Sequence, residues 1–231
     1  MEVALLFVGR VQHYYAESYQ TQILQSLRCQ GFQTIDVFLS HNGNNINDPL
    51  QQFVKDYHVT QHESVILHPS QYEHILIPVK EGVYNYNSIT MFYHMHRVYQ
   101  MAAAYQQTHQ RKYKAIIYLR ADAHFEDPLI LPSSLQPNAV YIPTIPTQSY
   151  INDQFAYGTP ESMATLCSLF SHLHSYVHND HISILPETMY QHHINTQKLT
   201  VQSITLRYQL NPHRRNGTWY VHPNAGKPQA T

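Results

Sequence analysis

The feature that most constrains the fold is an unbroken apolar run, VALLFVG, over residues 3–9. A strand with one solvated face alternates apolar and polar residues, whereas an unbroken run is typical of a strand buried on both faces, as in a parallel sheet. Apolar residues at helical spacing follow and end near Gly31, and a second run, TIDVFLS, covers 34–40. This order predicts a right-handed βαβ unit and an α/β fold with a mostly parallel, doubly wound sheet.

Periodicity and turn residues predict further elements along the chain. Ser88 to Gln107 predicts a mostly buried helix that carries Arg97, and a buried guanidinium needs an anion such as a phosphate or an aspartate. Thr159 and Pro160 predict the start of another helix that runs to about Val177. The remaining expected elements are strands over 63–69, 138–145 and 198–206, the last near a sheet edge, and a helix over 185–194.

The stretch KAIIYLRADAHFED, residues 114–127, joins a buried strand to polar groups. Ile116 to Leu119 is apolar, and Arg120, Asp122 and His124 follow at once. Ligands in open α/β sheets bind beyond the carboxyl ends of the strands, so this position favours chemistry. The alternative is a solvated strand exit at which the arginine and an aspartate pair loosely on the surface.

Composition excludes several classes. A net charge of −1 excludes the broad basic field of a nonspecific nucleic-acid binder. The turn after the first strand has neither GxGxxG nor GK followed by Ser or Thr, which disfavours a dinucleotide-binding fingerprint and a phosphate-binding loop. Cys29 and Cys167, each in a helical pattern, predict two buried thiols in a reducing compartment. No stretch approaches the ~18 apolar residues of a transmembrane helix, so we expect a cytoplasmic protein.

The order of these segments resembles nucleotide-sugar glycosyltransferases of the GT-A fold, in particular small single-domain members of algal DNA viruses and microbes. The similarity rests on the buried first strand, the helix with Arg97, the strand ending in RAD, then NDQFAYG, PET and a basic carboxyl-terminal loop. It implies one domain over residues 1–220, with 221–231 a flexible tail. It also implies sugar transfer from a nucleoside diphosphate sugar, which we expect to be UDP-linked, to a hydroxyl of a glycan or another acceptor.

In that family a DxD motif holds Mn²⁺ or Mg²⁺, which bridges the two phosphates of the donor. The matching triplet here is Arg120-Ala121-Asp122, so an arginine replaces the first carboxylate. The interpretation we favour is that Asp122 ligates the metal with help from water, phosphate and His213. The alternative is that Arg120 does part of the work of the metal as a fixed cation.

The resemblance also implies roles for other residues. Asp153 binds sugar hydroxyls or acts as the base, Gln154 lies near the reacting carbon, and Glu187 at a helix start deprotonates the acceptor. The remaining implied contacts are Arg10 and Asp36 with the nucleoside, and Arg97, Arg214 and Arg215 with the diphosphate.

Each of these residues has a structural explanation as well. Asp153 also fits a turn that enters a strand, and Glu187 also fits a carboxylate favoured by the helix dipole. A non-catalytic module that binds a glycan or nucleotide is the alternative for the whole chain, favoured by Arg120. A zinc hydrolase is a third hypothesis, prompted by 18 histidines, but the chain has no HExxH motif.

Overall fold

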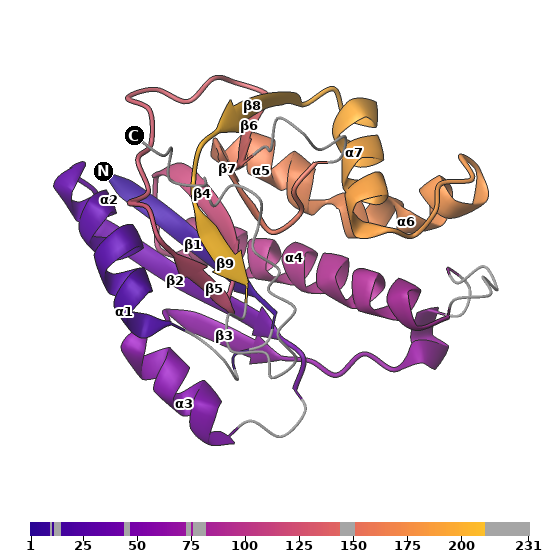
Figure 1. Cartoon of the computed structure of the whole chain (residues 1–231), viewed down its shortest axis with the longest axis horizontal. Coiled ribbons are helices and arrows are strands. Elements are labelled where there is room, and N and C mark those ends of the chain that lie inside the picture. The colour runs from indigo at the N-terminus through magenta and orange to yellow at the C-terminus, as the bar shows by residue number, and fades with distance from the viewer. Residues whose placement is uncertain are drawn as a thin grey trace, which may run out of the picture.

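A seven-stranded sheet forms the centre of the computed structural model, which describes residues 1–9, 11, 15–43, 47–72, 75, 82–143 and 151–210. The strand order is β3-β2-β1-β4-β7-β6-β8 (Figure 1). The strands are β1 (Glu2–Val8), β2 (Thr34–His41), β3 (Gln61–Ser64), β4 (Tyr113–Arg120), β6 (Ala139–Pro143), β7 (Phe155–Gly158) and β8 (Thr200–Ile204). The long apolar runs of the sequence are therefore the central strands β1, β2 and β4.

The sheet is parallel except at β7. Strand β1 pairs in parallel with β2 and β4, β2 with β3, and β6 with β8, whereas β7 runs antiparallel to β4 and β6. Leu119 near the carboxyl end of β4 is paired with Phe155, the first residue of β7. The residues that precede β7 therefore meet those that end β4, at one edge of the sheet.

Helices cover both faces of the sheet (Figure 1). One face carries α4 (Gly82–Thr108), with α5 (Pro160–Cys167), α6 (Leu169–His178) and α7 (Pro186–Thr196) around it. The other carries a continuous helical stretch of α1 (Ala16–Ser18), the π-helical η1 (Tyr19–Gln25) and α2 (Ser26–Cys29), together with α3 (Asn47–Asp56). A short 3-10 turn, η2 (Pro69–Tyr72), precedes α4.

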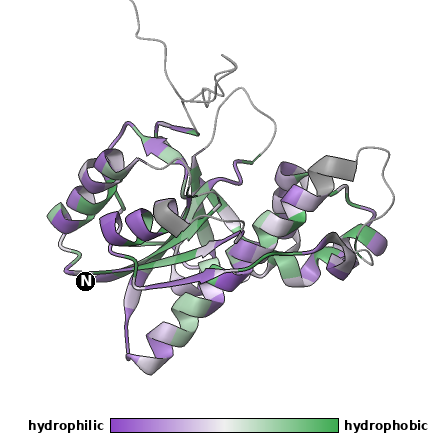
Figure 2. Ribbon diagram, turned by 90° about the horizontal axis from the view of Figure 1, so that it is seen from below, coloured by the Kyte–Doolittle hydropathy of each residue, from purple (hydrophilic) through white to green (hydrophobic). Residues whose placement is uncertain are grey.

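Side chains of the central strands alternate between the two cores. Leu6 and Tyr118 lie in the core under α4, and Leu5 and Ile117 lie in the core under the first helices. These strands are mostly green in Figure 2 because both of their faces are buried. The α/β fold with a mostly parallel sheet is thus confirmed, and apolar burial on both faces explains why these segments lack polar alternation.

A second, two-stranded sheet begins shortly after the end of β4. Strand β5 (Ala123–Phe125), directly after the RAD triplet, pairs antiparallel with β9 (Tyr208–Leu210). The ion pair between Arg207 and Asp127, 2.6 Å from Nη2 to Oδ1, fastens the same two segments together. No sequence pattern indicated this pairing, and it brings the end of the described chain beside β4.

Several predicted boundaries need correction. Strand β3 ends at Ser64 and does not continue to residue 69, and the helix predicted from Pro160 to Val177 is divided at Ser168 into α5 and α6. The predicted cap is confirmed, since Thr159 Oγ1 accepts a hydrogen bond from the Ser162 N–H. The position of β8 at the sheet edge is also confirmed.

Two further predictions concern cysteine burial and membrane helices. Cys167 is buried as predicted, but Cys29 is exposed, so the prediction of two buried thiols was wrong for Cys29. The described part of the chain contains no helix with the length and apolar character needed to span a bilayer.

Candidate functional site

The candidate site lies where β1 and β4 end and β7 begins. Strand β1 is followed by Gly9, whose φ of +102° favours glycine, and a β-carbon built there would lie 3.9 Å from Asp122 Oδ1. Val8 is paired with Arg120, and the Ala121 N–H donates to the Val8 carbonyl. The chain after β4 is therefore held against the turn after β1, with Asp122 facing that turn.

Arg120 and Asp122 form a two-pronged ion pair. Nε and Nη2 of Arg120 donate to Oδ1 and Oδ2 of Asp122, each at 2.8 Å. The Asp122 side chain is 7% exposed and that of Arg120 is 27% exposed. Burial by itself lowers the pKa of Arg120, but the hydrogen bonds and charge of Asp122 outweigh it and raise that pKa. The guanidinium is therefore a permanent, oriented cation.

Asp153 is a buried carboxylate within electrostatic reach of this pair. Burial first and the charge of Glu187 second raise its pKa, the charge of Arg120 opposes them, and the net pKa is about 6. Glu187 lies in the first turn of α7, directly after Pro186, as predicted. Residues from the end of β4, the start of β7 and the start of α7 thus come together, although they are far apart in the sequence.

A closed ring of hydrogen bonds fixes the turn that carries Asp153. The Asn152 amide Nδ2 donates to Tyr208 Oη at 2.6 Å, Tyr208 Oη donates to Gln154 Oε1 at 3.2 Å, and the Gln154 N–H donates to Asn152 Oδ1 at 2.8 Å. Sequence reasoning missed Asn152 and Tyr208 as parts of the site. Tyr208 comes from β9, and no local pattern predicts which strand β9 will join.

Two buried tyrosines surround Asp153 on the side of α4. The hydroxyls of Tyr118 and Tyr190 are buried without a hydrogen-bond partner in the described part of the chain. Burial raises the pKa of both, and the charge of Asp153 contributes to each shift. Asp153 therefore lies in a desolvated, aromatic environment, which explains why its charged form is disfavoured.

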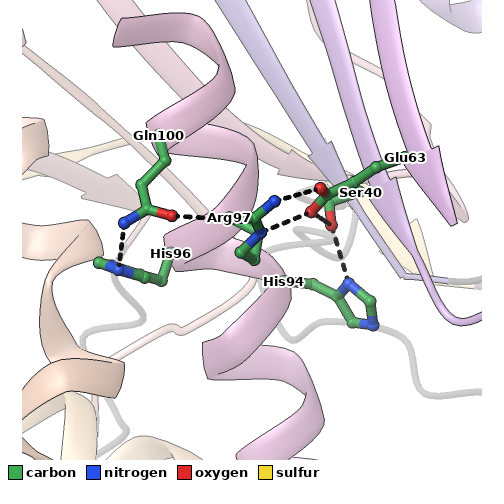
Figure 3. A network of polar contacts seen from close by, with 6 residues as sticks. All are labelled: Ser40, Glu63, His94, His96, Arg97 and Gln100. Carbon is green, nitrogen blue, oxygen red and sulfur yellow. Dashed lines mark hydrogen bonds and ion pairs between the residues drawn. The ribbon is translucent and has the colours of Figure 1, made fainter. Parts of the chain in front are cut away.

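Arg97 does not join the other predicted site residues. Its Nε and Nη2 donate to the carboxylate of Glu63 on β3, at 3.2 and 2.8 Å, and its side chain is 42% exposed (Figure 3). The premise that this arginine is buried was wrong, and its acidic partner among the described residues is Glu63 and not an aspartate.

Asp36 also lies elsewhere. It accepts a hydrogen bond from Tyr113 Oη at 2.9 Å and is ion-paired to Arg111 Nε at 3.1 Å, near the amino end of β4. The predicted nucleoside contact of Asp36 therefore does not fit its place at the opposite edge of the sheet. The other predicted residues, Arg10, His213, Arg214 and Arg215, lie outside the described residues.

The residues at this site do not fit the divalent cation that the GT-A resemblance implies. Both carboxylate oxygens of Asp122 are bound by Arg120, so a cation there would face a guanidinium. Within the described ranges, no group of three or more His, Cys, Asp or Glu side chains is placed to hold a metal ion. Mg²⁺ is usually held by one or two carboxylates together with waters and phosphates, and the one carboxylate that RAD offers is already paired with Arg120.

Comparison with known proteins finds similarity at the level of structure only. No protein-family model and no curated protein matches the chain. Among solved structures, the chain is similar to the apo form of the glycosyltransferase GlyE of Streptococcus pneumoniae TIGR4, with 12% sequence identity and a TM-score of 0.43. The alignment covers 88% of this chain and 45% of that one, so the chain spans less than half the length of GlyE.

Proposed function

We propose that this protein transfers a sugar from a nucleoside diphosphate sugar to an acceptor hydroxyl. The proposal is carried by one observation: a cationic group and a group that can act as a base lie together at one edge of the sheet. A fixed guanidinium, Arg120, lies within electrostatic reach of a buried carboxyl, Asp153, whose pKa is about 6. Such a transfer needs a cation for the departing diphosphate and a base for the acceptor. The resemblance of RAD, NDQFAYG and PET to GT-A segments supports the same reaction class.

Arg120 would bind the diphosphate. Asp122 accepts hydrogen bonds from its Nε and Nη2, and Nη1 would donate to phosphate oxygens. A guanidinium held on one edge by a carboxylate loses little conformational freedom when it binds an anion on the other. Arg120 would thus offset the charge that develops as the diphosphate departs, and no step is assigned to a metal ion.

Asp153 would accept the proton of the acceptor hydroxyl. A general base works best when its pKa lies near the working pH, and a value of about 6 leaves Asp153 ionised at pH 7 yet basic enough to take a proton. Glu187 keeps that pKa high through its charge and is the alternative base, as it is less buried than Asp153. The hydrogen-bonded ring around Asn152, Gln154 and Tyr208 would keep Asp153 in position.

The proposed step conserves atoms and charge. The acceptor oxygen forms a bond to the anomeric carbon, and the bond from that carbon to the phosphate oxygen breaks. Its electron pair leaves on the nucleoside diphosphate beside Arg120, and the proton of the hydroxyl passes to the carboxylate of Asp153. Electrostatic stabilisation of the leaving group is the main catalytic contribution we expect.

A panel of nucleotide sugars tests the proposal through slow hydrolysis of the donor, which needs no knowledge of the acceptor. We expect turnover of a UDP-sugar by the wild type and loss of 10²-fold or more in Asp153→Asn. A non-catalytic binding module, favoured by the arginine in place of the first DxD carboxylate, predicts nucleotide or glycan binding without turnover. Absence of both binding and turnover with every donor would overturn the proposed function.

A further inference from the structure

A chain of hydrogen bonds runs from β3 through β2 to α4 (Figure 3). Ser40 Oγ lies 2.8 Å from Glu63 Oε1 and 2.9 Å from His94 Nδ1. Glu63 also receives two hydrogen bonds from Arg97. His94 is 3% exposed, and Ser40 is fully buried.

The direction of each hydrogen bond follows from the charges. Burial opposes ionisation of Glu63, but the hydrogen bonds from Arg97 and Ser40 outweigh it and lower its pKa, so its carboxylate only accepts. Ser40 must therefore give its one proton to Glu63. Its oxygen can then only accept from His94, which places the proton of that imidazole on Nδ1. Burial lowers the pKa of His94 to about 4, so the ring is neutral.

His94 Nε2 is consequently unprotonated, and its lone pair points in a fixed direction. It is buried, and no donor among the residues that the structure describes reaches it. His41, at the end of β2, repeats the arrangement: its Nδ1 donates to the Asn42 carbonyl at 3.3 Å, and its Nε2 is likewise buried without a described partner. Buried acceptors without partners are rare in native proteins and indicate a missing donor.

The position of Ser40, which His94 contacts, relative to Arg120 is set by the sheet. Val8 is paired with Ser40 on one side and with Arg120 on the other. Neighbouring strands lie ~4.8 Å apart, so the two residues are separated by roughly 10 Å on the same face of the sheet. A ligand whose diphosphate binds Arg120 would cross the end of β1 and reach the end of β2, near His94, with its far end.

We propose that His94 Nε2 accepts a hydrogen bond from a ring N–H of the nucleobase of the donor, and that Ser40 and Glu63 act as positioning residues by fixing the His94 tautomer. This inference rests on the proposed function, because it requires a nucleoside diphosphate at Arg120. The base is the part of such a ligand that lies far from its diphosphate, and uracil and guanine present a rigid ring N–H. A metal ion is the other common partner of an imidazole lone pair, but no third ligating side chain joins His41 and His94 in the described ranges.

The test compares nucleotides with and without the ring N–H. Isothermal calorimetry on the full chain would use UDP with its N3-methyl analogue, and GDP with its N1-methyl analogue. For the nucleotide that binds, we expect methylation to weaken binding by about ten-fold or more in the wild type, because the acceptor loses its donor. In His94→Ala, which removes the acceptor and makes room for the methyl group, the two nucleotides of the pair should bind within about two-fold of one another.

His96→Ala is the matched control. His96 lies on the same helix but points away from Ser40, toward Gln100, and its Nδ1 bonds the Cys167 carbonyl (Figure 3). This variant should keep the full penalty for methylation. A wild type that binds both nucleotides of a pair equally well would overturn the inference and leave the proposed function standing. If no nucleoside diphosphate binds, the proposed function fails and the inference fails with it.

The tautomer gives a second readout that does not depend on any nucleotide. In protein labelled with ¹⁵N-histidine, NMR should show His94 protonated at Nδ1 and bare at Nε2. Ser40→Ala, which removes the acceptor for Nδ1–H, should shift His94 toward the other tautomer and reduce the methylation penalty. A wild-type His94 protonated at Nε2 would exclude the proposed acceptor.

Discussion

The carboxylate of Asp122 binds the guanidinium of Arg120 through two hydrogen bonds of 2.8 Å, although only one residue separates them in the chain. In a DxD motif the same two positions would carry two negative charges. Here they carry one of each sign, so the site presents a cation of its own to an anionic ligand. The predictions on the diphosphate follow from this exchange of charge.

Arg120→Lys should weaken binding of a nucleoside diphosphate by about 10- to 100-fold. A lysine keeps the charge but cannot bind Asp122 on one edge and a phosphate on the other, and a lost hydrogen bond to a charged group costs about 1.5–3 kcal/mol. Calorimetry checks the value. Arg111→Lys is the control, since it alters the ion pairs with Glu2 and Asp36 at the opposite edge of the sheet and should leave binding unchanged.

Removal of divalent metal should leave diphosphate binding unchanged. The oxygens of Asp122 are already occupied by Arg120, so the cation that would screen the phosphates is part of the protein. Titrations after dialysis against EDTA, and again with Mn²⁺ restored, measure this directly. A tenfold or greater gain on adding Mn²⁺ would show that Asp122 releases Arg120 to bind metal.

Asp153→Asn should stabilise the fold while it lowers turnover by about 10²-fold or more. The pKa of Asp153 rises from 3.8 to about 6 on folding, so the folded state holds the proton more tightly and the ionised form costs stability. The cost grows as the pH rises from about 4 to 6 and then stays constant, at about 3 kcal/mol as an upper limit. Denaturant unfolding at pH 7 should therefore show a gain of about 1–3 kcal/mol.

The control is Asp127→Asn, for which we expect a change in stability of the opposite sign. Hydrogen bonds from Arg207 lower the pKa of Asp127, so Asp127 stabilises the fold above its unfolded pKa and loses that contribution as the pH falls. Asp127→Asn should slightly destabilise the protein at pH 7. Equal changes in the free energy of unfolding for both variants would contradict the assignment of a desolvated Asp153.

Wild-type turnover should fall as the pH drops below about 6, because Asp153 becomes protonated there and can no longer accept a proton.

Gly9→Ala should destabilise the protein by about 1–2 kcal/mol, because φ at this position is +102° and a side chain strains that conformation. Space is not the cause, since the added carbon would lie in ordinary contact with Asp122. Gly158→Ala makes the contrast: its added carbon would lie 2.9 Å from the Ala139 carbonyl oxygen, so its cost is steric. Thermal unfolding of both variants measures the two effects.

Cys29 should react with a thiol reagent in the native protein, and Cys167 should not. Cys29 is exposed, whereas Cys167 is buried and burial raises the pKa of its thiol. Mass spectrometry should find one label per chain under native conditions and two after unfolding. A double label on the native chain would show that the core around α5 opens readily.

The central sheet was predictable because burial on both faces leaves a local signal. Unbroken apolar runs such as residues 3–9 and 116–119 indicate burial on both faces without knowledge of distant partners. The same reasoning placed Arg120, Asp122, Asp153 and Glu187 at ends of elements, and the structure brings these four together. Turn and cap residues are local too, which is why Thr159 was identified correctly.

What the sequence could not reveal depends on partners far away in the chain. Arg97 looked buried because its helix is apolar, but the helix has one open strip, where Glu63 of β3 binds it. Tyr208 enters the site only through the pairing of β9 with β5. The tautomer of His94 depends on Ser40 and Glu63, two residues of other strands, and no period or spacing along α4 encodes it.

The place of β1 between β2 and β4 has a consequence for biosynthesis. Val8 meets Ser40 soon after it is made, but its other neighbour, Arg120, is translated 112 positions later. Until then an apolar strand has an open edge, which is the kind of surface on which nascent chains aggregate or recruit chaperones. The ribosome must therefore deliver the chain as far as Arg120 before these two parts of the ligand site can meet.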